Sequence, residues 1–100
     1  MTKRYAAIEA NGGYVWGVTD APDGDLVGAA EKIDRDAGCW FPEKRYTEGT
    51  ESDRRAGATG FIVYEVPAGF WVEDGASPAE IDAVDNCPRA GFVIITGVVS

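Results

Sequence analysis

The sequence predicts one α+β domain spanning residues 1–100, in which an antiparallel sheet of about five strands carries two helices on one face. Three observations lead to this prediction. Short apolar stretches typical of strands are separated by turns rich in glycine and proline, and two helical patterns lie between them. The chain has 100 residues, of which 45% are hydrophobic, so it is long and apolar enough to form a core.

The chain is expected to begin with a β-hairpin. Its strands are Tyr5–Glu9 and Tyr14–Thr19, and Asn11-Gly12-Gly13 supplies the positive φ angles that tight hairpin turns require. Alternation along the second strand places three side chains on one face: Tyr14, Trp16 and Val18.

A helix follows the turn Ala21-Pro22-Asp23-Gly24. Its apolar positions recur at helical spacing, and Gly38 is a typical C-terminal stop. These positions are Leu26, Ala29, Ala30, Ile33 and Ala37.

The middle of the chain predicts two strands, Lys44–Glu48 and Phe61–Val66, with Phe70–Val72 continuing as extended chain. Between the strands, Gly49–Gly60 is polar and long for a hairpin connection. We therefore expect a loop there that is mobile or functional.

The second helix has the sharpest local signal. Ser77 at the N-cap, Pro78 at the first helical position and Glu80 at the third predict a capping box. Ile81 and Val84 should face inward, and the helix should end before Pro88 because the residue preceding a proline disfavours the helical conformation.

The final strand, Gly91–Val99, is the most hydrophobic of the chain. Its residues are apolar at both odd and even positions. Such a strand is either buried from both sides or paired across a subunit interface.

The order ββαββαβ, without its first strand, is the split β-α-β order of ferredoxin-like domains, which predicts two antiparallel helices on one face. The start of the first helix would then lie beside the end of the second. Negative charges at a helix C-terminus cost ~0.3–1 kcal/mol each, which indicates a functional reason for them. The carboxylates expected to form this partner-binding patch are Asp20, Asp23, Asp25, Asp82 and Asp85.

Charge favours a binding module for a basic partner over an enzyme. Lys and Arg number 9, Asp and Glu number 17, the net charge is -8, and there is no histidine to serve as general base or metal ligand. Direct contact with nucleic acid or an anionic membrane is not expected. The start of the chain lacks a signal-peptide pattern, so we expect a cytoplasmic protein, either a monomer or a homodimer.

No cofactor or metal is expected. Cys39 and Cys87 should be free thiols for two reasons. They follow helices that are expected to run antiparallel, so they should lie too far apart to form a disulfide, and the cytoplasm is reducing. Asp20-x-x-Asp23-Gly24-Asp25 could be a calcium loop, but the spacing of the EF-hand ligands is absent, so turn and N-cap roles are favoured.

Two adjacent aromatic pairs, Trp40-Phe41 and Phe70-Trp71, lie at the edges of predicted elements. Neighbours in extended chain point to opposite faces, so one member of each pair should be buried and the other can be exposed. Tryptophan is enriched at binding hot spots, which makes Trp40 and Trp71 candidate partner contacts.

The chain resembles the short acidic proteins of bacteriophages and mobile elements, including anti-CRISPR proteins. The features that carry the resemblance are the small size, two zones with acidic and no basic residues (between Arg4 and Lys32, and between Arg55 and Arg89), and tracts such as Tyr14–Val18 and Val63–Phe70. The resemblance implies an inhibitor that binds a basic nucleic-acid-binding host protein or ribonucleoprotein complex by mimicking DNA charge. Two alternatives remain open. One is a ligand-binding domain or enzyme using Tyr14 and Trp16, and the other is a structural dimer formed through the C-terminal strand.

Overall fold

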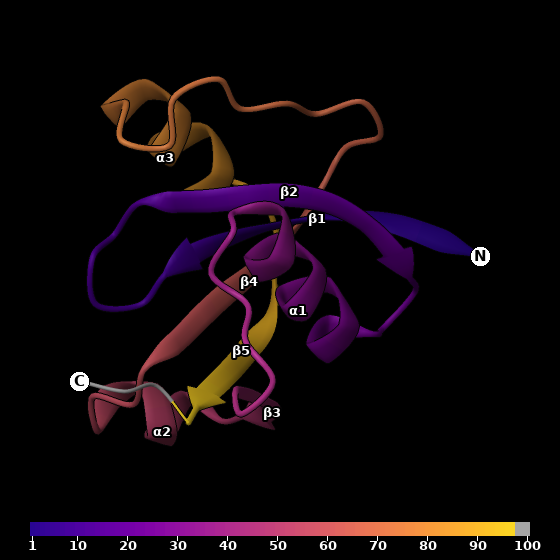
Figure 1. Ribbon diagram of the computed structural model, residues 1–100. Coiled ribbons are helices and arrows are strands. Elements are labelled where there is room, and N and C mark those ends of the chain that lie inside the picture. Colours follow the sequence, from indigo (N-terminus) through magenta and orange to yellow (C-terminus); the bar gives the residue numbers. More distant parts are fainter. Residues whose placement is uncertain (98–100) are drawn as a thin grey trace.

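The structure, a computed structural model, describes residues 1–97 and contains a five-stranded antiparallel sheet with the strand order β2-β1-β4-β5-β3 (Figure 1). The strands are β1 (Thr2–Glu9), β2 (Val15–Pro22), β3 (Arg45–Gly49), β4 (Gly60–Val66) and β5 (Arg89–Thr96). The helices are α1 (Leu26–Asp36), α2 (Glu51–Arg55) and α3 (Pro78–Asp85).

The predicted α+β class and five-stranded antiparallel sheet are confirmed, but the strand order differs from a ferredoxin-like sheet. Strand β1 is not an addition at the edge; it lies between its hairpin partner β2 and the distant strand β4. Helix α1 joins β2 to β3, which run in the same direction and form the two opposite edges of the sheet. A split β-α-β unit would instead separate its two parallel strands by a single strand.

The two longer helices cover opposite faces of the sheet, so the prediction of one shared face is wrong (Figure 1). Strand β1 shows why. Its residues Tyr5 to Ile8 are all buried, and alternate side chains point to opposite faces. Tyr5 and Ala7 pack beneath α1, whereas Ala6 and Ile8 pack on the side of α3. A strand that is apolar on both faces needs cover on both sides.

The cover is unequal on the two faces. Helix α1 contributes Leu26, Ala29, Ala30 and Ile33 to its core, as its helical spacing predicts. Helix α3 contributes only one fully buried residue, Val84, and the loop before it adds the half-buried Phe70 and Val72. The α3 layer is therefore thin and partly made of loop.

A β-bulge in β2 changes the predicted side-chain alternation. Ile8 pairs with Val15 and Ala7 with Gly17, which leaves Trp16 as an extra residue. As a result Trp16 packs against the α1 core while Val18 packs against the other core, so the two do not share a face.

Two helix starts differ from expectation. The expected loop Gly49–Gly60 contains α2, which begins with a capping box between Thr50 and Asp53. Helix α3 begins where predicted, but the side chain of Ser77 makes no capping hydrogen bond. Glu80 instead accepts a hydrogen bond from the backbone N–H of Asp74, at 3.1 Å.

Strand β5 is buried from both sides within the chain. It lies between β4 and β3, so both of its edges are occupied and it cannot pair across a subunit interface. Phe92 belongs to the α3 core, whereas Val93 and Ile95 belong to the α1 core. Val98 and Val99, which were expected to extend this strand, lie outside the described residues.

Candidate functional site

The acidic residues around the turn after β2 are largely engaged within the chain. Asp20 forms an ion pair with Arg4 at 3.1 Å, and Asp23 forms one with Lys3 at 3.4 Å. Asp25 is the N-cap of α1 and accepts a hydrogen bond from the N–H of Gly28 at 2.9 Å. Asp25 is therefore an N-cap and Asp23 lies in the turn, as predicted, whereas Asp20 belongs to β2 and pairs with Arg4.

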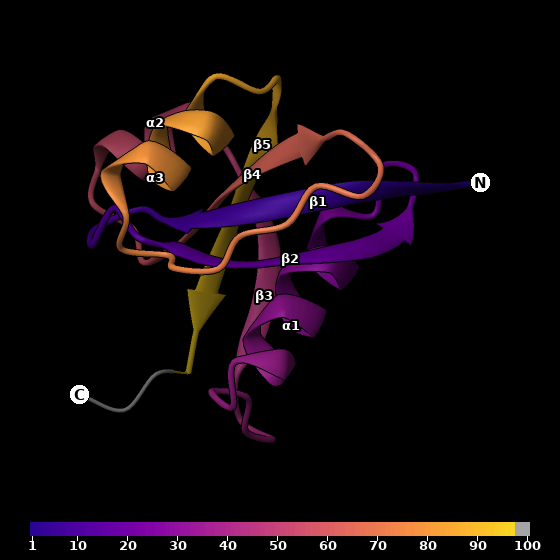
Figure 2. The same cartoon turned by 90° about the horizontal axis from the view of Figure 1, so that it is seen from above.

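The structure does not bring this turn together with α3, the helix that carries Asp82 and Asp85. Helix α3 lies on the other face of the sheet. Both views place it near the N-terminal end of β2, whereas the turn follows the C-terminal end of this strand (Figures 1 and 2). The expected patch of five aspartates is thus divided in two. The division follows directly from the placement of the helices on opposite faces.

The α3 half of the predicted patch is joined by further acids from the preceding loop. We call the set the α3 acidic segment: Glu73, Asp74, Glu80, Asp82 and Asp85. None of its carboxylates forms an ion pair within residues 1–97. The chain has no Lys or Arg between Arg55 and Arg89. The guanidinium of Arg89 itself lies near Asp85, because it donates to the Tyr64 hydroxyl at 3.4 Å.

Hydrogen bonds hold parts of the α3 acidic segment in place. Tyr64 on β4 donates to Asp85 at 2.8 Å, and Asp74 and Glu80 are linked through the backbone. Burial, and then the hydrogen bond to Asp85, raise the pKa of the Tyr64 hydroxyl, which therefore stays a donor near neutral pH. The last turn of α3 contains no basic residue to offset its negative charges.

The two candidate tryptophans differ in exposure. Trp40 is half-buried against the outer side of α1, where its indole N–H donates to Glu31 and the Arg35 guanidinium lies 4.0 Å from its ring centroid. Trp71 is 69% exposed, next to the α3 acidic segment, while its neighbour Phe70 packs against the core. The second pair thus has one half-buried and one exposed member, whereas Trp40 and Phe41 are both half-buried, so the expected contrast is absent from the first pair.

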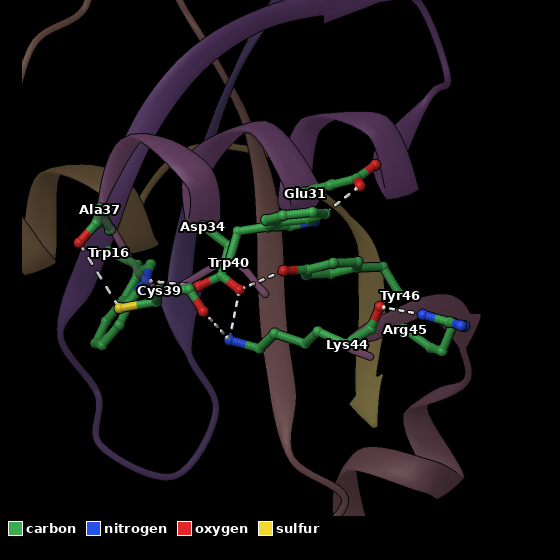
Figure 3. A network of polar contacts seen from close by, with 9 residues as sticks. All are labelled: Trp16, Glu31, Asp34, Ala37, Cys39, Trp40, Lys44, Arg45 and Tyr46. Carbon is green, nitrogen blue, oxygen red and sulfur yellow. Dashed lines mark hydrogen bonds and ion pairs between the residues drawn. The ribbon is translucent and has the colours of Figure 1, made fainter. Parts of the chain in front are cut away.

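A buried polar network, which the sequence analysis missed, is centred on Asp34 of α1 (Figure 3). Asp34 is only 1% exposed. Its carboxylate lies 2.6 Å from the Lys44 ammonium and accepts hydrogen bonds from Tyr46 at 2.5 Å and Trp16 at 3.2 Å. The available signal was spacing, because Asp34 lies four residues after the buried Ala30.

The Asp34 network is better suited to holding the fold than to chemistry. Burial, and then the hydrogen bond to Asp34, raise the pKa of Tyr46. The three donors occupy the carboxylate, and a small cavity of about 150 Å³ next to it is lined by apolar Phe61 and Ile95 as well as Asp34 and Lys44. No buried side-chain polar atom within residues 1–97 lacks a hydrogen-bond partner.

The cysteines are both free thiols, as predicted, and both are half-buried: Cys39 follows α1 and Cys87 follows α3. In the described part of the chain, no group of three or more His, Cys, Asp or Glu side chains could hold a metal ion. None of the helices formed by residues 1–97 combines the length and the apolar character that crossing a bilayer requires.

Comparison of the chain with protein-family models, with curated proteins and with solved structures found no match.

Proposed function

We propose that this chain is a non-enzymatic binding protein that uses the α3 acidic segment to bind and inhibit a basic, nucleic-acid-binding host protein or ribonucleoprotein complex. One observation carries the proposal. Five carboxylates gather on α3 and the loop before it, and none has an ion-pair partner within residues 1–97.

Unpaired surface carboxylates cost the folded chain some self-repulsion, and they attract positively charged surfaces. Proteins that bind nucleic acid present clustered Lys and Arg to the phosphate backbone. Clustered carboxylates can occupy such a surface in place of phosphates. The resemblance to anti-CRISPR proteins supports the same mode of action, in which the inhibitor competes with DNA for its site.

The packing supports this proposal more than a ligand site on an aromatic sheet face. Tyr14 lies in the turn before β2, and Trp16 is packed against the α1 core and hydrogen bonded to Asp34. Both faces of the sheet are covered, one by α1 and the other by α3 with its loop. The two aromatics therefore do not form an open stacking surface.

The test uses CRISPR effector ribonucleoproteins, whose nucleic-acid channel is positively charged. Each effector is mixed with the chain before labelled target DNA is added, and DNA binding is measured at low and high salt. We expect the wild-type chain to prevent DNA binding, more effectively at low salt. The double variant Asp82→Asn, Asp85→Asn should inhibit less, mainly through slower association with the effector.

The matched control is the double variant Asp20→Asn, Asp23→Asn, which removes the same charge from ion-paired positions on the other half of the predicted patch. This control should inhibit as the wild type does. Equal inhibition by the α3 variant and the wild type would show that the α3 acidic segment is ordinary solvated surface. Absence of inhibition across the effectors would overturn the anti-CRISPR mode of action.

A further inference from the structure

Strand β2 forms one edge of the sheet, and the loop before α3 runs along it (Figure 2). Only β1 pairs with β2, so alternate residues of β2 direct their backbone N–H and C=O groups away from the sheet. An edge of this kind can accept a further strand.

The loop closes the edge at its start only. The N–H of Val15 donates to the carbonyl of Gly75 at 2.9 Å. The two backbones approach so closely that a Cβ on Gly75 would lie 2.1 Å from the Val15 oxygen. This contact anchors the loop to the first residue of β2, and it is the one backbone hydrogen bond between the loop and β2 among the described residues.

Beyond this anchor the β2 edge lines a groove of about 320 Å³, which we call the β2-edge groove. Gly17 and Val18 of β2 form its floor together with Trp16. The end of α1, with Asp36, borders it on one side, and the loop residues Trp71 and Glu73 border it on the other.

The walls of the groove indicate the chemistry of an occupant. Asp36 and Glu73 are exposed, and neither forms an ion pair in the described part of the chain. The Trp71 ring is 69% exposed, and an exposed indole face attracts Lys and Arg side chains. The groove thus combines backbone hydrogen-bonding groups, two unpaired carboxylates and a cation-binding ring.

We propose that the β2-edge groove binds an extended, basic peptide segment of the partner, which adds a strand beside β2 and places its Lys or Arg side chains between Asp36, Glu73 and Trp71. Strand addition uses backbone hydrogen bonds for affinity and alternate side chains for specificity. This inference rests on the proposed function and specifies the form of the basic partner.

The charges of the groove favour a basic peptide over a second copy of the chain as the occupant. Pairing of β2 with the β2 of another copy would bring Asp36 and Glu73 close to the same carboxylates of that copy. Like charges placed together at an interface are unfavourable. A basic segment gains from the same carboxylates, so the groove favours a heterologous partner.

The experiment uses a labelled, blocked peptide that repeats two lysines and two valines as the probe, because neighbouring lysines of a strand point to opposite faces and so reach both sides of the groove. Its affinity is measured by fluorescence anisotropy, and its site by amide chemical-shift changes. Two matched peptides accompany it. One replaces lysine by glutamate, and the other, made in both registers, carries N-methyl groups on alternate backbone amides, which removes donors from one edge while keeping the charge.

We expect the lysine peptide to bind and to shift the amides of Trp16–Val18 and Trp71–Glu73, and the glutamate peptide not to bind. One register of N-methylation should abolish binding. Trp71→Ala should weaken binding about tenfold, the loss of a cation–π contact in a partly desolvated site. The double variant Asp36→Asn, Glu73→Gln should weaken binding and reduce its salt dependence.

Glu48→Gln serves as the control, because Glu48 is exposed on β3 at the opposite edge of the sheet and does not line the groove. Its affinity for the peptide should stay within about twofold of wild type. Equal binding of both N-methylated peptides, shifts confined to other surfaces, or no binding at all would each overturn strand addition at β2. An effector inhibited by the chain in spite of such a result would leave the proposed function standing, so the two failures are distinguishable.

Discussion

The ammonium of Lys44 lies 2.6 Å from the carboxylate of Asp34, and the two side chains are 10% and 1% exposed. This buried ion pair is completed by Trp16 of the edge strand β2 and Tyr46 of the opposite edge strand β3 (Figure 3). One carboxylate on α1 therefore binds donors from both edges of the sheet. The network therefore holds α1 to both edge strands of the sheet.

The first prediction concerns this pair. Replacing Asp34 by Leu should lower the free energy of unfolding by ~3–5 kcal/mol, because it leaves the Lys44 charge buried without its partner. Urea denaturation of the purified variant measures this change. The double variant Asp34→Leu, Lys44→Met should lose less than the single variant, since no uncompensated charge remains.

The exposed pair Lys3–Asp23 provides the control for this measurement. Replacing Asp23 by Asn should change the free energy of unfolding by less than ~1 kcal/mol, as is usual for surface ion pairs. If Asp34→Leu had as small an effect as this control, the network would not hold the fold.

The second prediction concerns pH. The pKa of Tyr46 is raised in the folded chain from its ordinary value of 10.0, first by burial and then by the hydrogen bond to Asp34. The folded state therefore holds this proton to higher pH than the unfolded state, so its contribution is complete below pH 10.0 and is lost as pH rises above it. Unfolding free energies measured through this range should fall less steeply for Tyr46→Phe than for wild type. Parallel slopes for the two proteins would contradict the assignment.

The third prediction compares two helix starts. The Thr50 side chain accepts a hydrogen bond from the N–H of Asp53 at 3.2 Å, whereas that of Ser77 makes no capping bond. Thr50→Ala should therefore lower the local opening free energy of α2 by about 1 kcal/mol, and Ser77→Ala should change α3 by much less. Amide hydrogen exchange within each helix measures both effects. A larger effect at Ser77 would reverse the capping assignment.

The fourth prediction concerns β5. Ile95 is 6% exposed in the α1 core, and Ile95→Ala should lower the free energy of unfolding by ~2–5 kcal/mol. Ile94 is only half-buried, so Ile94→Ala should lower it by less. Deletion of the chain after Phe92 should abolish folding, because β5 joins β4 to β3. A truncated chain that melts cooperatively would show that the strand is dispensable.

The fifth prediction concerns the charges of α3. Asp82 and Asp85 lie in a helix end without a compensating base, so their replacement by Asn should leave the melting temperature unchanged or raise it slightly. Asn at position 85 keeps an oxygen that can accept from Tyr64. A marked fall in the melting temperature would assign these carboxylates a structural role instead.

Local sequence signals predicted most elements of the fold, because they depend on neighbouring residues. The hairpin, α1, β4 and the start of α3 at Pro78 follow from turn chemistry, helical spacing and proline placement. Helix α2 was not predicted, but the capping-box spacing of Thr50 and Asp53 was a signal for it. The strand order was not, because the pairing of β1 with β4 depends on residues far apart in the chain. The two-sided apolar run Tyr5–Ile8 was the available sign that β1 is a central strand.

The candidate site depended on the fold prediction and changed with it. Asp82 and Asp85 are on the surface, as expected, but placing α3 on the opposite face separates them from Asp20 and Asp23. Ion pairing with Lys3 and Arg4 could not be foreseen, because it depends on the register of the β1–β2 hairpin. The buried role of Asp34 required knowing that β2 and β3 both reach the same helix.

The central position of β1 has a consequence for synthesis on the ribosome. Strand β1 emerges first with β2, but its second neighbour β4 begins only at Gly60, and β3 has no partner until β5 is made. A two-stranded hairpin is marginally stable in water, so the nascent chain carries an unsatisfied edge along Ala6, Ala7 and Ile8 until Gly60–Val66 has been made. The sheet can close only after Arg89–Thr96 has been synthesised, because this last strand joins β4 to β3.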